Sequence, residues 1–169
     1  MKKSALFLTL FAAFAMIFAS CSKDSSSNNN NSGGGHNYGT ITFGSQQFKI
    51  AHSGYAVDYD EDISANIVGI GLATADDASG AAISIPFYSA IPTGQFTLKI
   101  TEEPEDGDGA LAIVLNSSPK YVATQGTLTI SNNGGDYTID ASGSAKSLTG
   151  TDVKNFTVHF TGPVPYHEQ

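Results

Sequence analysis

The chain has 169 residues and a formal net charge of −8, from 16 acidic residues and 8 basic residues, all of them lysine. So acidic a surface repels nucleic-acid phosphates and anionic lipid headgroups, and without arginine it lacks the planar fork that binds phosphate bidentately. Nucleic acid is therefore not an expected partner. The single cysteine rules out an intrachain disulfide, so the packing of one core must stabilise the fold.

Residues 1–20 are typical of a removable export signal. The apolar stretch Ala5–Phe18 has 14 residues, too few to span about 30 Å of hydrocarbon as a resident helix. Ala19-Ser20 then precede Cys21, an arrangement that resembles the lipobox of bacterial lipoproteins, although that family usually has Leu where this chain has Phe18. The resemblance implies that the thiol of Cys21 carries lipid with acyl chains such as palmitate, and that these chains anchor the protein in a membrane. The alternative is an ordinary secretory signal with an incidental cysteine.

The residues after Cys21 predict where the anchored protein faces. Ser22-Lys23-Asp24 resembles the export signal of Bacteroidota surface lipoproteins, with Ser25 in place of the usual second acid. This resemblance implies display on the outer face of the outer membrane, and the periplasmic face is the alternative. The Ser-, Asn- and Gly-rich segment up to residue 37 cannot bury apolar area. We therefore interpret residues 21–37 as the lipidated cysteine and a disordered tether.

From residue 38 onward the apolar residues recur with a period of two, which indicates strands. Phe96–Ile100 and Phe156–Phe160 alternate apolar with polar residues, and turn signals such as Gly44-Ser45 and Asn132–Gly135 separate the runs. Residues 38–169 are therefore predicted to form an all-β domain of about nine or ten antiparallel strands. We favour a β-sandwich over a flattened barrel, because no run looks long enough for a strand of a wide barrel.

Three C-terminal stretches and one turn resemble parts of small Bacteroidota lipoprotein domains, most of which have no assigned activity. They are Gly126–Ile130, Tyr137–Asp140, Phe156–Val164 and the turn Ile91–Gly94. The resemblance implies a fold of the β-sandwich type and no defined activity.

Several chemistries lack the residues that they need. The four histidines show no metal-binding spacing, no thiol lies in the domain, and no Gly-x-Ser-x-Gly elbow is present. A serine triad stays open, because its members can be distant in the chain. Loop carboxylates without a tryptophan to stack a sugar argue against a glycosidase. We expect a protein that is not an enzyme and has no resident cofactor, with calcium as the one candidate ion.

The candidate calcium ligands lie in the loop Glu102–Gly109. Glu105 precedes Asp106-Gly107-Asp108-Gly109, and carboxylates that alternate with glycine in a tight loop can place several oxygens around Ca²⁺. The alternative is a solvated acidic loop. Further acidic clusters lie at Asp58–Asp62 and Asp76-Asp77.

Tyr55 and Tyr59 are four residues apart, so they share one face of a regular strand and could offer a stacking surface to a ligand. Partly buried sheet tyrosines are the alternative. Together these features predict a non-enzymatic binding module for a glycan or an envelope protein. The rival hypothesis is a structural or assembly subunit whose edge strands pair with neighbours.

Overall fold

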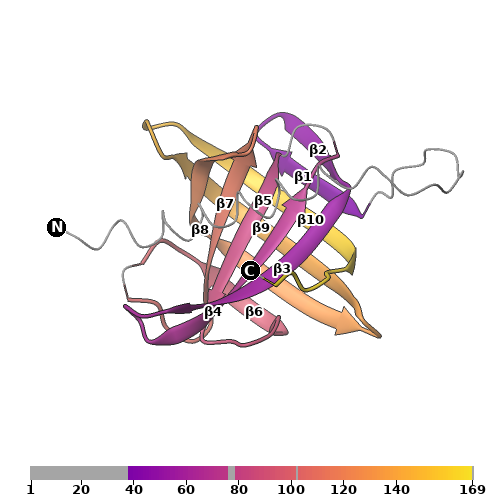
Figure 1. Cartoon of the computed structure of the whole chain (residues 1–169). Helices are drawn as coiled ribbons and strands as arrows, with labels where there is room; N and C mark the ends of the chain where they lie inside the picture. The colour runs from indigo at the N-terminus through magenta and orange to yellow at the C-terminus, as the bar shows by residue number, and fades with distance from the viewer. Residues whose placement is uncertain (1–37, 76–78, 102, 169) are drawn as a thin grey trace, which may run out of the picture.

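Alternating apolar and polar residues, rich in β-branched and aromatic side chains, form ten β-strands in a computed structural model that describes residues 38–75, 79–101 and 103–168 (Figure 1). The strands are β1 (Gly39–Phe43), β2 (Gln46–Ile50), β3 (His52–Asp60), β4 (Ala65–Ala73), β5 (Gly80–Pro86), β6 (Gly94–Leu98), β7 (Asp108–Leu115), β8 (Ser118–Asn133), β9 (Asp136–Ser147) and β10 (Val153–Pro163). The all-β prediction and the expected number of strands are confirmed. No helix within the described ranges could cross a membrane. The predicted signal, Cys21 and the tether lie outside them.

The ten strands form one hydrogen-bonded sheet in the order β2-β1-β10-β9-β8-β6-β7-β5-β4-β3. The long strand β8 pairs with β7 through its first half and with β6 through its second half. Since β6 and β7 thus lie on the same side of β8, they also meet each other, and they run parallel there. The sheet is therefore mixed, whereas the sequence predicted antiparallel strands throughout.

The sheet curls so that its two halves face each other across the core, with β8, β9, β10 and β1 opposite β3, β4, β5 and β7 (Figure 1). Because the hydrogen bonding is continuous, two separate sheets of a sandwich are not confirmed. The premise about strand length was wrong, since β8 has 16 residues and β9 has 12. β9 includes residues 141–147, which contain serine and glycine and look like loop. Gly143 fits there because a side chain would collide with the backbone of Gln125 on β8.

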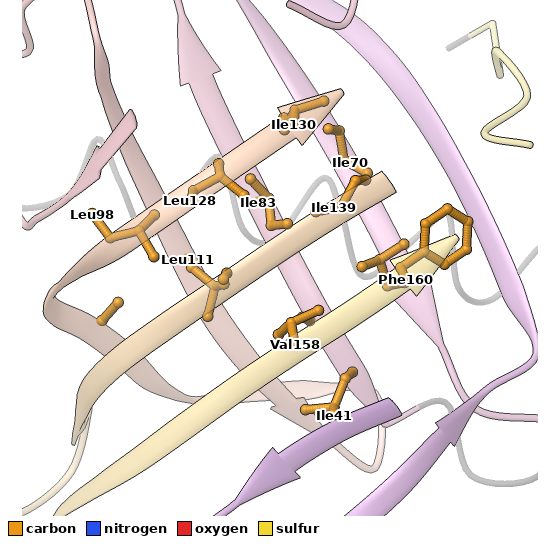
Figure 2. Close-up of a cluster of buried hydrophobic side chains, with 14 of the residues drawn as sticks. Ile41, Ile70, Ile83, Leu98, Leu111, Leu128, Ile130, Ile139, Val158 and Phe160 are labelled. Atoms are coloured by element: carbon orange, nitrogen blue, oxygen red, sulfur yellow. The ribbon is translucent and has the colours of Figure 1, made fainter. Parts of the chain in front are cut away.

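The core fills the space between the two halves of the curled sheet (Figure 2). β4, β5 and β7 contribute one set of large aliphatic side chains, and β1, β8, β9 and β10 contribute the facing set. Burying each such side chain stabilises the fold by roughly 1.5–3 kcal/mol. The labelled members in Figure 2 are Ile41, Ile70, Ile83, Leu98, Leu111, Leu128, Ile130, Ile139, Val158 and Phe160.

The chain itself occupies part of the sheet edges. β2 and β3 are the outermost strands, yet only Ala51 separates them, and its N–H donates to the carbonyl oxygen of Ala73 at 2.8 Å. On the outer edge of β3, the N–H of Tyr55 donates to Pro165 O at 2.9 Å, and the N–H of His167 donates back to Tyr55 O at 2.8 Å. The C-terminal segment therefore covers this part of β3, which limits pairing with other chains there.

Candidate functional site

The outward faces of β4, β5 and β7 carry unusually small residues. Ser84 on β5 lies between Gly69 on β4 and Ala110 on β7 in the sheet register. Two residues further along the strands, on the same face, Ile67 pairs with Pro86. The inward positions of the same strands hold large aliphatic residues, so these strands are buried on both faces. A floor with such short side chains leaves room for another group to approach the sheet closely.

A small pocket, part of it open to solvent, lies over this floor. Ile67, Ser84, Pro86 and Ala110 line it from the strands. One wall comes from Asp60 at the end of β3 and Ile63 in the β3–β4 turn. The other comes from the β6–β7 loop and the start of β7, with Lys99, Thr101, Pro104 and Asp108. Most of the surface that lines the pocket is apolar, so each polar group there needs its own account.

The hydroxyl of Ser84 is the most unusual polar group in the pocket. Ser84 is only 2% exposed, and its Oγ has no hydrogen-bond partner among the described residues. Its sheet neighbours cannot supply one, because Gly69 has no side chain and Ala110 offers a methyl group. A buried unpaired hydroxyl costs about 1–3 kcal/mol, so it calls for an explanation. A ligand group or an ordered water is the kind of partner that would satisfy it.

Asp108 organises the wall opposite the β3–β4 turn. It is 6% exposed, its Oδ2 lies 2.9 Å from Lys99 Nζ, and the same oxygen accepts a hydrogen bond from the N–H of Glu105 at 2.7 Å. The N–H of Asp108 donates to Glu105 O at 3.0 Å, and Gly107 between them has a φ of +89°. These bonds close a tight turn that leads the acidic loop into β7.

Asp60 organises the other wall. Its Oδ1 accepts hydrogen bonds from the N–H of Asp62 at 2.9 Å and from the N–H of Ile63 at 3.3 Å. A short side chain that bonds the backbone two residues on is typical of an Asx turn, and here it places Ile63 in the pocket wall. Asp60 and Asp108, which come from two acidic clusters far apart in the sequence, therefore line one pocket.

The predicted calcium ligands have other partners in the structure. Asp106 Oδ1 accepts a hydrogen bond from the hydroxyl of Tyr88 at 2.6 Å. This bond, together with burial and the carboxylate charge, raises the pKa of Tyr88 above its usual value. Asp108 is paired with Lys99, and Glu105 is exposed. No group of three or more metal-binding side chains is found within the described ranges. Calcium binding stays a prediction.

The two candidate tyrosines share a face of β3 but have different surroundings. Tyr55 packs against the core, and its ring lies edge-on to Tyr166 with a centroid distance of 5.2 Å. Tyr59, near the end of the strand, is 58% exposed. Four strand residues separate the two rings by roughly 13 Å along the strand. Because side chains alternate along a strand and Asp60 lines the pocket, Tyr59 lies on the opposite face of β3 from the pocket.

Three exposed apolar residues, Tyr59, Phe87 and Ile100, are neighbours, in the chain, of residues that line the pocket. Phe87 has a φ of +73°, which is unfavourable for a bulky side chain, and its N–H donates to Asn66 O at 2.8 Å. Asn66 pairs with Tyr59 in the sheet register. None of these three residues is among the described residues that line the pocket.

Sequence reasoning singled out the acidic loop and the tyrosines but missed Ser84, Lys99 and the apolar floor. One signal for the floor is present in the sequence: small residues alternate with large ones in β4, β5 and β7. Comparison of the chain with protein-family models, curated proteins and solved structures gives no match. The function is therefore argued from the residues of this chain alone.

Proposed function

We propose that this protein is a non-enzymatic binding module, held at the outer membrane by lipid on Cys21, whose pocket takes a group presented by an envelope protein. The observation that carries this proposal is the buried, unpaired hydroxyl of Ser84 on the floor of an apolar pocket. A hydroxyl in that position destabilises the free protein and gains a partner when a ligand binds.

The same hydroxyl supports a role without catalysis. A nucleophilic serine needs a base within roughly 2.6–3.2 Å to accept its proton. Among the described residues Ser84 Oγ has no hydrogen-bond partner at all, so no such base is in place. Lys99, the basic residue in the pocket lining, forms a salt bridge with Asp108. The residues of the pocket are suited to binding.

A protein fits the pocket better than a glycan does. Sugar sites combine several convergent polar groups with aromatic rings that stack on the sugar face. Of the described residues that line this pocket, none is aromatic and most are apolar. Tyr59 is exposed but lies on the opposite face of β3, so it does not supply a ring at the pocket. An apolar lining is suited to an apolar group presented by a polypeptide.

The rival role, a subunit that assembles through its sheet edges, has one observation against it. The C-terminal segment already bonds to β3 at Tyr55, and Ser53 Oγ donates to Pro163 O at 2.6 Å. Edge pairing at this point would first have to displace the segment. An assembly role would therefore have to use other parts of the edge strands.

Site-specific photo-crosslinking in the native envelope tests the pocket. A photoreactive residue at Ile63 should give a discrete product with one envelope protein, because Ile63 lines the pocket. The same residue at Val153, which is exposed on β10, is the matched control and should not give that product. Filling the pocket with Ala110→Leu should abolish the product from position 63. No product, or the same product from both positions, would refute the proposal.

Orientation is tested separately with protease added to intact cells. The sequence after Cys21 implies the outer face, so cleavage between about residues 25 and 37 should release the domain, because a polar, disordered tether is cut most easily. Protection until the outer membrane is lysed would place the protein on the periplasmic face and leave the binding proposal in force.

A further inference from the structure

We propose that the outer edge of β3 is a surface for self-association, which the C-terminal segment (residues 164–168) covers in the monomer and leaves when two copies pair. While the segment is bound, this edge is closed to other chains. The proposal concerns the edge of the sheet and is independent of the pocket. It is carried by the bonds that the segment makes to β3, by the small number of those bonds, and by the register in which two copies of β3 can pair.

The C-terminal segment binds the edge of β3 as a neighbouring strand would (Figure 1). Tyr55 directs its backbone groups outward, where its N–H donates to Pro165 O at 2.9 Å and its carbonyl oxygen accepts from the N–H of His167 at 2.8 Å. Tyr55 and Tyr166 thus form a parallel bridge, and their rings meet edge-on with a centroid distance of 5.2 Å. This edge therefore accepts an extended chain that carries a tyrosine.

The segment is held at few points. Val164 is buried in the core at 5% exposure, whereas Tyr166 is 54% exposed and Pro165 and Glu168 are exposed as well. Beyond Val164, the backbone bonds between the described part of the segment and the sheet are the two at Tyr55. A segment with so few buried contacts opens at a low cost in free energy. Its release can stop at Val164, which leaves the core intact.

The outer edge of β3 continues beyond the part that the segment covers. Residues of an antiparallel strand bond alternately to its two sides, so Val57 and Tyr59 direct their backbone groups outward as Tyr55 does. The N–H of Tyr59 bonds to the carboxylate of its own neighbour Asp58 at 2.8 Å. Within the described ranges, no backbone bond from a turn, a loop or the segment reaches Val57. The edge thus has three residues in a position to pair with a strand, and the segment uses one of them.

A second copy of β3 fits this edge in an antiparallel register centred on Val57. Tyr55 then lies opposite Tyr59 of the second copy, and the two rings meet because both residues lie on the same face of their strands. Tyr59, which is 58% exposed in the monomer, takes the place beside Tyr55 that Tyr166 holds when the segment is bound. Pairing at all three residues forms about six backbone hydrogen bonds, more than the two segments give up.

The charges of β3 permit this register and oppose the alternative. Asp58 lies opposite Ala56 of the second copy, and Asp60 lies opposite Gly54, so no two carboxylates face each other. A parallel pair in the same register would place each carboxylate against its own copy, which destabilises a sheet. The net charge of −8 repels two copies at long range, but 0.15 M salt limits this repulsion to about 8 Å. The antiparallel pair is therefore the arrangement that the edge favours.

Two kinds of variant release the segment. Deletion of residues 165–169 removes it from the edge outright. Gly54→Ala adds a Cβ that would collide with the ring of His167, and Gly54→Ala with His167→Ala makes room for that Cβ again. Self-association should therefore appear in the deletion variant and in Gly54→Ala, and it should disappear again in the double variant. Far-ultraviolet circular dichroism confirms for each variant that the β structure is retained.

Disulfide formation in the native envelope, read on a non-reducing gel, tests the register. Val57→Cys places two thiols at the centre of the pair, where Cα atoms about 5.5 Å apart suit a disulfide. Tyr59→Cys is the matched control, because its side chain is more exposed but its two copies lie roughly 13 Å apart along the pair. The protein without an added cysteine gives the background from Cys21.

Release of the segment should raise the dimer from Val57→Cys about tenfold, because the segment no longer competes for Tyr55. Tyr59→Cys should stay at background in every variant. The proposal is overturned if neither release variant gives the dimer, or if Tyr59→Cys gives as much dimer as Val57→Cys, which would indicate random collision. A disulfide from Val57→Cys to a different envelope protein would assign the edge to another partner and also overturn self-association.

Discussion

Replacing Ser84 with alanine removes a hydroxyl that the free protein does not use. The side chain is 2% exposed and its Oγ has no partner among the described residues. Burying a hydroxyl without a hydrogen bond costs about 1–3 kcal/mol, and alanine keeps the Cβ that packs between Gly69 and Ala110. Ser84→Ala should therefore raise the free energy of unfolding by about 1 kcal/mol and weaken binding of the pocket ligand.

Urea denaturation of the full-length protein, followed by far-ultraviolet circular dichroism, measures the change. For a domain of this size about 1 kcal/mol corresponds to a rise in Tm of about 3–5 °C. The matched control is Ser53→Ala, because the hydroxyl of Ser53 donates to Pro163 O at 2.6 Å. Losing that bond should lower the free energy of unfolding by about 0.5–1.5 kcal/mol. The two serine-to-alanine changes should thus have opposite signs.

The opposite result for Ser84 would refute the reasoning. If Ser84→Ala lowers the free energy of unfolding as Ser53→Ala does, the hydroxyl is satisfied in the free protein and is part of its structural hydrogen bonding. The pocket would then lose the feature that marks it as a binding site. If stability rises but the crosslink from position 63 is undiminished, the hydroxyl is unpaired yet takes no part in binding.

Three further predictions concern other residues. Because the pKa of Tyr88 is raised, its bond to Asp106 stabilises the fold fully below about pH 10, the ordinary tyrosine value, and this stabilisation is lost as the pH rises through the raised pKa. Tyr88→Phe should therefore remove the latest step of tyrosine ionisation, measured by absorbance at 295 nm. An unchanged late step would assign that step to another tyrosine. Cys21→Ala should abolish labelling by a fatty-acid analogue, and undiminished labelling would disprove lipidation. If calcium binds the acidic loop, millimolar Ca²⁺ should raise the Tm by several degrees, more than Mg²⁺ does, and Asp106→Asn with Asp108→Asn should remove the effect; equal shifts from both ions and from monovalent salt would indicate screening.

The local structure of the strands could be predicted from the sequence because alternation directly determines which face each residue occupies. In β10, Phe156, Val158 and Phe160 are buried while Thr157 and His159 are exposed, as the period of two indicates. The Gly44-Ser45 hairpin was also predicted: Phe43 pairs with Gln46 across a two-residue loop, and Gly44 has a φ of +58°.

The order and length of the strands could not be predicted in the same way. The sequence gives no local sign that β1 pairs with β10, or that β6 lies parallel to β7, because both pairings depend on the register of distant segments. The length of β8 was hidden by a bulge between Ala123 and Gln125, and that of β9 by its serines and glycines. The pocket was missed for the same reason, since its floor and its two walls come from segments that only the sheet brings together.

The residues that break local rules are not spread evenly over the molecule. Two consecutive non-glycine residues with positive φ, Asn116 and Ser117, are explained by the two-residue loop between β7 and β8, which requires that conformation. No turn of that kind accounts for Phe87, which lies next to the pocket residue Pro86. The unpaired hydroxyl of Ser84 adds a second cost at the same place.

Both features lower the stability of the fold, and one of them, the hydroxyl of Ser84, lies in the pocket itself. Natural sequences tend to break local rules at functional sites and to compensate elsewhere, here through the large core between the two halves of the sheet. That these two costs fall at and next to one pocket is the strongest argument that the pocket has been retained for binding.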